Sequence, residues 1–224
     1  MTGPISVQID RIPLRLSNAY LIRGDDISIL IDAGMPGEAA RLLETIKQHG
    51  NPRLDWIFLT HAHFDHFGSA TQLKRATGAK VLIQKDDAPA LMAGETLLGE
   101  VRGRGRLTAR VLPLIERLFP VEPMAPDVVF DQDYTFPGSR LKIRAMHTPG
   151  HTTGSSSIVI ENTHLFAGDL VSTNGAAHAQ RYYAHDWEAL SISLAAIKSL
   201  KPTHTYPGHG PDLLTLEALL QLSI

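Results

Sequence analysis

The chain has 224 residues, of which 43% are hydrophobic, and this is enough apolar surface for the core of a single domain spanning 1–224. Its 21 basic and 23 acidic side chains give a formal charge of −2, which argues against nucleic acid as a partner, because nucleic-acid binders present a basic face to phosphates. The absence of cysteine excludes disulfides, thiolate metal sites and cysteine nucleophiles, whereas the 11 histidines are many for this length.

The first half of the chain alternates strands with helices. Apolar residues at 5, 7 and 9 predict a strand, and further strands are expected at 20–22, 27–31, 56–59 and 81–83. One helix is expected from Ala39 to a stop at Gly50, and a second from Gly68 to Thr77 with Gly78 as its stop.

The second half returns to strands, expected at 141–145, 156–160, 165–167 and 204–206. Asp186 is expected to cap a helix, and a last helix is expected to start at Asp212. Two β-rich halves that each carry helices predict two packed sheets with helices outside. The fold class is therefore α/β, with a four-layer αββα sandwich.

Residues 91–126 interrupt this pattern as a helical insert. Apolar residues from Leu107 to Leu118 have helical spacing, although Pro113 is expected to kink or shorten that helix. The Arg-Gly segment 102–106 precedes it, and is either a solvated hinge between two helices or part of a mobile lid. We expect the apolar insert to form one wall of a substrate pocket.

The segment 60–66, Thr-His-Ala-His-Phe-Asp-His, follows a strand that we expect to be buried. In extended backbone His61 and His63 point the same way, so both imidazoles can reach one metal ion. Asp65 and His66 come where the chain turns into the next helix and can face a second ion. The alternative is that all four are surface polar residues of a loop.

Three more residues of the metal-binding type follow later strands. His151, Asp169 and His209 each stand near a glycine, which lets backbone approach closely. Each is weak evidence alone, because a single histidine is more often structural and a single aspartate after a strand is usually a turn former. Together with the first cluster they place five histidines and two aspartates at the ends of different strands.

These motifs, from Asp32-Ala33-Gly34 to Pro207-Gly208-His209-Gly210, resemble the metallo-β-lactamase-fold superfamily over nearly the whole chain. The resemblance implies the αββα sandwich, with metals at the edge between the two sheets. It also implies the ligand set: His61, His63 and His151 for a first metal, Asp65, His66 and His209 for a second, and Asp169 bridging both. Asp32 resembles the family's buried aspartate beneath the site; the alternative is a turn-forming residue before Gly34.

Nitrogen and oxygen ligands without thiolate favour two zinc ions, with iron or manganese as alternatives. A water shared by two zinc ions ionises near neutral pH, and we expect the bridging hydroxide to be the nucleophile. Asp65 would orient it and move a proton to the leaving group. The expected reaction is hydrolysis of a small ester, thioester or lactone.

Departures from the family's patterns bear on the reaction. The superfamily's β-lactamases carry Cys or Ser in place of Asp169, so this residue disfavours antibiotic hydrolysis. Asp169 with the Pro-Gly-His-Gly ending most resembles the hydroxyacylglutathione-hydrolase and lactonase branches, although Ser172 stands where many lactonases have Tyr. Two alternatives stay open: a mononuclear iron persulfide dioxygenase using His61, His151 and Asp169, and a phosphodiesterase on the same two metals.

The loop 174–185 starts close to a proposed ligand, so we expect it to face the pocket. The candidates for substrate contact there and just before it are Ser172, His178, Arg181, Tyr182 and Tyr183, and ordinary loop packing is the alternative. The expected partner is a small-molecule substrate, with a homodimer as one option for assembly. No signal-peptide core and no apolar run of spanning length is visible, which predicts a cytoplasmic protein without a membrane partner.

Overall fold

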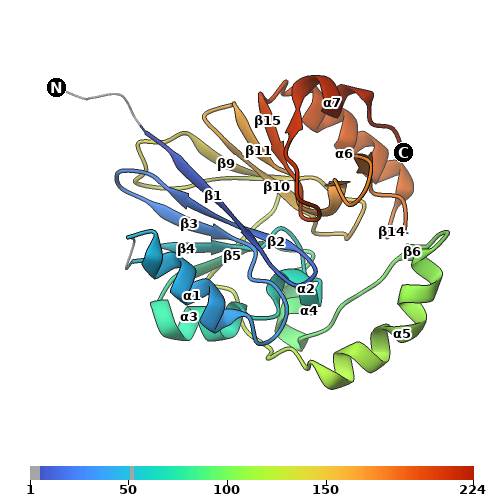
Figure 1. Ribbon diagram of the computed structural model, residues 1–224, viewed down its shortest axis with the longest axis horizontal. Helices are drawn as coiled ribbons and strands as arrows, with labels where there is room; N and C mark the ends of the chain where they lie inside the picture. Colours follow the sequence, from blue (N-terminus) through green and yellow to red (C-terminus); the bar gives the residue numbers. More distant parts are fainter. Residues whose placement is uncertain (1–5, 51–52) are drawn as a thin grey trace.

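The computed structural model describes residues 6–50 and 53–224. Two six-stranded sheets face one another (Figure 1). The first sheet has the order β1-β2-β3-β4-β5-β7, with β1 (Gln8–Pro13), β2 (Asn18–Arg23), β3 (Ser28–Ile31), β4 (Trp56–Phe58), β5 (Lys80–Gln84) and β7 (Val128–Phe130). The second has the order β16-β15-β11-β10-β9-β8, with β8 (Asp133–Thr135), β9 (Ile143–His147), β10 (Ser156–Ile160), β11 (His164–Phe166), β15 (His204–Tyr206) and β16 (Leu214–Thr215).

Strand periodicity decides which side chains fill the space between the sheets. Successive residues of a strand point to opposite faces, so Ile29 and Ile31 of β3 enter the core between the sheets while Leu30 points to the other side. Phe58 of β4 and Phe166 of β11 belong to that same inter-sheet core. The apolar strands predicted without alternation are buried on both faces, as expected where helices cover the outside.

Helices cover the two outer faces. α1 (Ala39–Gln48), α3 (Ala70–Thr77) and α4 (Ala88–Ala93) pack on the first sheet, and α6 (Trp187–Ser199) and α7 (Leu216–Gln221) pack on the second (Figure 1). This layering confirms the predicted αββα sandwich. No helix in the described ranges is both long and apolar enough to cross a bilayer.

Most predicted elements are confirmed, with shifted ends. Gly50 follows α1 and Gly78 caps α3, both in the left-handed region with φ of 69° and 71°. The first strand begins at Gln8, and position 5 lies outside the described residues. The predicted start of the last helix at Asp212 is wrong: β16 intervenes, and Thr215 caps α7 by accepting a hydrogen bond from the amide of Ala218 (3.2 Å).

The insert differs from its prediction in two ways. α5 (Gly105–Leu118) runs through Pro113 without ending there. Pro113 is exposed, so water can satisfy the carbonyl that loses its amide donor. The segment 102–106 is not a hinge between two helices, because β6 (Glu100–Val101) precedes it and pairs with β14 (Tyr183–Ala184). α5 lies apart from both sheets in Figure 1 and leaves Leu107 70% exposed.

Candidate metal centre

The predicted ligands lie on loops that leave the carboxyl ends of strands in both sheets. β3 and β4 are parallel, as are β11 and β15, and β9 runs in the same direction as β11 because both are antiparallel to β10. The loops after β3 and β4 therefore leave the same end of the first sheet, and those after β9, β11 and β15 leave the same end of the second. The ligand groups drawn from both sets of loops place these ends at one edge of the sandwich. The loop after β4 carries the short helix α2 (Phe64–Phe67), and the loop after β11 is a single 3-10 turn (Gly168–Leu170).

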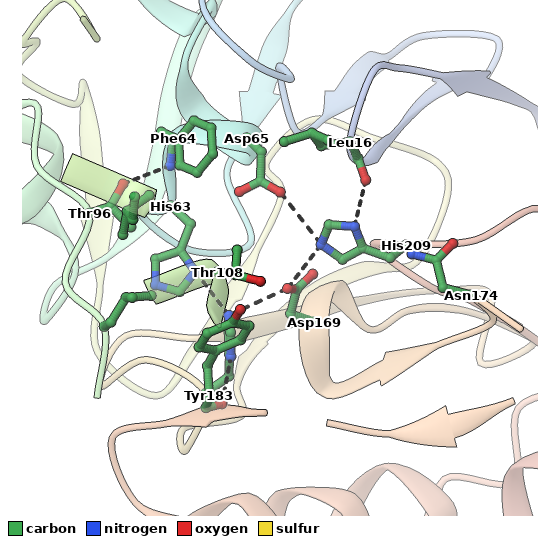
Figure 2. Close-up of a pocket in the computed structure, with 13 residues that line it drawn as sticks. Leu16, His63, Phe64, Asp65, Thr96, Thr108, Asp169, Asn174, Tyr183 and His209 are labelled. Atoms are coloured by element: carbon green, nitrogen blue, oxygen red, sulfur yellow. Dashed lines mark hydrogen bonds and ion pairs between the residues drawn. The ribbon is translucent and has the colours of Figure 1, made fainter. Parts of the chain in front are cut away.

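The structure brings all seven predicted ligand side chains together. Three groups have ligand atoms within 4.8 Å of one another: His61, His63 and His151; His61, His66 and Asp169; and Asp65, His66 and His209. The carboxylate of Asp169 lies between the outer groups, with Oδ2 at 3.1 Å from Nε2 of His209 and 3.4 Å from Nε2 of His151 (Figure 2). Gly208 allows this approach, because a Cβ there would lie 2.4 Å from Oδ1 of Asp169.

Three histidines are oriented by backbone carbonyls outside the site. The pairs are His63 Nε2 with the carbonyl of Leu97 (3.1 Å), His151 Nδ1 with that of Tyr183 (3.0 Å), and His209 Nδ1 with that of Leu16 (2.7 Å). A carbonyl only accepts, so the ring nitrogen facing it carries a proton, and the other nitrogen is directed into the site. This is the arrangement that surrounding residues impose on histidines that bind metals.

Asp32 orients the other two histidines. Its carboxylate lies 2.8 Å from Nδ1 of His66 and accepts a hydrogen bond from the hydroxyl of Thr60, which in turn is 3.0 Å from Nδ1 of His61. Asp32 has a φ of 60°, a left-handed backbone conformation that aspartate adopts more readily than most residues. The structure therefore places Asp32 beneath the site, as the resemblance implies. Its carboxylate orients two histidines and is not merely a turn-forming group.

One nitrogen in the cage has no partner. Nε2 of His61 is buried and makes no hydrogen bond to any residue in the described ranges. A buried polar atom without a partner costs free energy, and such atoms are rare in folded proteins. A metal ion would satisfy this lone pair, so the residues present fit a metal site.

Burial and charge divide the cage into a neutral side and a charged side. Burial lowers the pKa of His61 far below its usual value and that of His151 to about 3, so both stay neutral. Burial lowers the pKa of both His66 and His209, but the neighbouring carboxylates together outweigh it. Asp169, Asp32 and Asp65 raise the pKa of His66 well above its usual value, and Asp169 and Asp65 raise that of His209 to about 9. These two cations hold the pKa of Asp169 down despite burial. Without metal, the protons on His66 and His209 therefore supply the positive charge that a metal ion would bring to the second group.

Asp87 is a buried residue at this edge that the sequence analysis did not single out. Its carboxylate accepts hydrogen bonds from the amides of Ala62 (2.7 Å) and Gly154 (2.7 Å) and from the hydroxyl of Thr152 (2.8 Å). It thereby joins the loop that carries His61 and His63 to the loop that carries His151. The available signal was the one used for Asp169: an aspartate soon after a buried strand.

Two cavities open from the ligand cage. The first, of about 280 Å³, is lined by Leu16, His63, Phe64, Asp65, Thr96, Leu98, Thr108, Leu112, His151, Asp169, Asn174, Tyr183 and His209 (Figure 2). The second, of about 260 Å³, is lined by Asp169, Ser172, Asn174, His178, Gln180, Arg181, Tyr182, Tyr183 and His209. All five residues proposed for substrate contact line the second cavity, and Thr96, Leu98, Thr108 and Leu112 of the insert line the first.

Comparison with known proteins gives relatives along most of the chain. A protein of Drosophila melanogaster described as a beta-lactamase-like protein 2 homolog is 30% identical over 200 residues, which are 88% of this chain; the chain spans only 59% of that relative. A probable metallo-hydrolase of Methanocaldococcus jannaschii is 30% identical over 198 residues, covering 87% of each chain. A hydroxyacylglutathione hydrolase of Ectopseudomonas mendocina is 39% identical, but over 43% of this chain and 39% of its own length.

Solved structures are similar over nearly the full length. A protein solved in a di-iron-bound form superposes with a TM-score of 0.65 at 27% identity, covering 96% of this chain and 97% of its own. BLEG-1, described as a B3 metallo-beta-lactamase, superposes with a TM-score of 0.71 at 26% identity, covering 94% and 95%. The model of one protein family, the metallo-beta-lactamase superfamily, matches residues 12–209. The chain therefore belongs to the metallo-β-lactamase superfamily.

Proposed function

We propose that the chain is a two-metal hydrolase that cleaves a small ester, thioester or lactone. The observation that carries this proposal is the orientation of the five histidines, each with one ring nitrogen engaged outside the cage and the other directed into it. His61, His63 and His151 would hold one ion, Asp65, His66 and His209 the other, and Asp169 would contact both. Bound divalent ions of this kind supply Lewis acidity toward a substrate carbonyl and toward water.

Residues of the chain supply the remaining needs of hydrolysis. Asp65 lines the first cavity and is 13% exposed, so its carboxylate can accept a proton from water and deliver it to a leaving group. Within the described ranges the hydroxyl of Tyr183 hydrogen-bonds only to the carbonyl of Gly105, at 3.4 Å, and such a long hydrogen bond leaves the hydroxyl available to a substrate oxygen. Phe64 and Leu112 provide apolar walls that exclude water from this cavity.

Zinc is the first choice of metal, because the cage offers nitrogen and oxygen ligands and no thiolate. The relative solved with two irons makes iron the second choice. The choice of a carbonyl substrate is supported by the partial match to a hydroxyacylglutathione hydrolase, while the likeness to BLEG-1 makes a β-lactam a necessary member of any substrate panel.

The test is metal analysis of the purified protein, followed by a panel of thioesters, lactones, β-lactams and phosphodiesters. We expect close to two ions per chain and turnover of at least one thioester or lactone. His61→Ala should remove metal and activity together, whereas His49→Ala, at the end of α1 and away from the cage, should retain both. Far less than one ion per chain, with no gain on adding zinc, would contradict the proposal. Turnover of phosphodiesters alone would identify a phosphodiesterase, and one iron with oxygen uptake on a persulfide would identify a dioxygenase.

A further inference from the structure

The helix α5 is attached to the rest of the protein along one side only. Its buried residues are Gly105 and Leu112, seven positions apart and therefore on the same side of the helix. Leu112 packs with Met35 and Phe64 in a small buried cluster. At the start of the helix a Cβ on Gly105 would lie 3.0 Å from Cβ of Tyr182, so the backbone there is in close contact with the protein.

Four apolar side chains lie on the side of α5 that is turned away from Gly105 and Leu112. They follow one another at intervals of four, three and four residues, a spacing that keeps side chains on one face of a helix. We call them the outer face of α5: Leu107, Val111, Leu114 and Leu118, which are 70%, 44%, 58% and 63% exposed. In Figure 1 this helix lies at the margin of the molecule. A continuous exposed apolar row of this kind is characteristic of a surface that binds a partner.

A row of arginines runs along the outer face. Arg106, Arg110 and Arg117 follow one another at intervals of four and seven residues, which places them on one strip of the helix beside the apolar row. All three are exposed, and none forms an ion pair with an acidic side chain in the described ranges. Their guanidinium groups are therefore available to an anionic partner.

Positive charge is concentrated in this part of the chain. The segment 102–118 contains five arginines and one glutamate, whereas the whole chain has a formal charge of −2. The glutamate, Glu116, is half-buried and follows Leu112 by four residues, so it belongs to the inner side of the helix. The outer face and the strip beside it therefore carry positive charge without a compensating carboxylate of α5.

The combination of the two rows decides which partner fits. At the surface of an anionic lipid bilayer, apolar side chains enter the boundary between headgroups and acyl chains while arginines reach the phosphates. A second copy of this helix would present the same arginines and no exposed carboxylate, so the charges of the two copies would repel one another. Nucleic acid would satisfy the arginines but would leave the apolar row in contact with a charged backbone.

We propose that α5 docks the protein on the surface of an anionic lipid bilayer, through the apolar outer face and the row of Arg106, Arg110 and Arg117. The sequence predicted no membrane partner because it has no apolar run of spanning length, but a helix that lies along the surface needs no such run. This docking does not depend on the hydrolysis proposed above, and its test measures binding alone.

The test is flotation of the metal-loaded protein with vesicles. One set contains phosphatidylcholine only, and the other contains about 30% phosphatidylglycerol in phosphatidylcholine. We expect the protein to float with the anionic vesicles at about 0.1 M salt, to bind them several-fold less at about 0.5 M, and to bind the neutral vesicles weakly at both.

Two double variants separate the contributions of the two rows. The variant with Leu114→Gln and Leu118→Gln, and the variant with Arg110→Gln and Arg117→Gln, should each bind anionic vesicles about tenfold less tightly than wild type. All four side chains are exposed, so circular dichroism and metal content should match wild type. The controls are Ile192→Gln on α6, where the side chain is 64% exposed, and Arg41→Gln on α1; both should bind as wild type.

Absence of wild-type binding to anionic vesicles would overturn the proposal, as would equal binding to neutral vesicles or equal loss in the control variants. Sedimentation velocity without lipid covers the competing occupant. A dimer that the leucine variant converts to a monomer, with no vesicle binding by wild type, would assign the outer face to a second copy. Binding to a DNA duplex but not to vesicles, measured by fluorescence anisotropy, would assign it to nucleic acid.

Discussion

Asp87 joins two ligand loops through three hydrogen bonds to its buried carboxylate. We predict that Asp87→Asn lowers the free energy of unfolding by about 1–3 kcal/mol, because an amide nitrogen would face donors that need an acceptor. The metal content should fall as well, since the loops of His63 and His151 lose their common support. Urea unfolding and metal analysis measure the two effects.

The neighbouring Asp86 supplies the matched control, because it is exposed and, among the described residues, its carboxylate accepts a hydrogen bond only from Gln84. Asp86→Asn should leave both stability and metal content near the wild-type values. If the two variants behaved alike, the carboxylate of Asp87 would have no special part in holding the loops.

Residue type determined how much of the site was predictable. The composition and spacing of histidine and aspartate in the segment 60–66 are enough to predict a metal site. The structure brings these residues together with His151, Asp169 and His209. The groups that orient them could not be predicted in this way. Every residue has a backbone carbonyl, so only the folded chain shows that those of Leu16 and Leu97 face a histidine.

At the level of elements, the contribution of the N-cap residue Asp186 to the stability of α6 can be measured directly. Its carboxylate accepts hydrogen bonds from the amides of Glu188 (2.8 Å) and Ala189 (3.0 Å) at the start of α6. We predict that Asp186→Ala lowers the free energy of unfolding by about 1 kcal/mol, the usual contribution of an N-cap. Asp212→Ala should have little effect, because Asp212 caps no helix. Chemical denaturation of the two variants checks this, and equal losses would count against the cap.

These two aspartates also show why some elements were predictable and others were not. The cap at Asp186 is a local interaction within its own helix, which a sequence pattern records. The amide of Asp212 instead donates to Thr173, which lies far away in the chain. The paired strands β6 and β14 are each two residues long, too short for any periodicity, and they exist because the fold brings them side by side.

For the whole molecule, the charges of the cage predict how the metal-free protein responds to pH. Folding raises the pKa of His209 to about 9, so its contribution to stability is fully present below about pH 6.5 and is lost as the pH rises through 9. His66, whose pKa is also raised, acts in the same direction. We therefore predict that chelator-treated protein is less stable at pH 9.5 than at pH 6.5, measured by urea unfolding.

Metal should remove this dependence, because bound ions take over the role of the protons and stabilise the folded state further at concentrations above their dissociation constant. His209→Gln should reduce the loss in the metal-free protein. A metal-free wild type that is as stable at pH 9.5 as at pH 6.5 would show that the cage carries no such protons.

The order of the ligands along the chain has a consequence for protein synthesis. The ribosome makes His61, His63, Asp65 and His66 first, and His209 long after them. A cation captured by the nascent chain would meet only part of its final coordination shell. If these residues bind metal as proposed, the complete ligand set is therefore available only after translation has passed position 209.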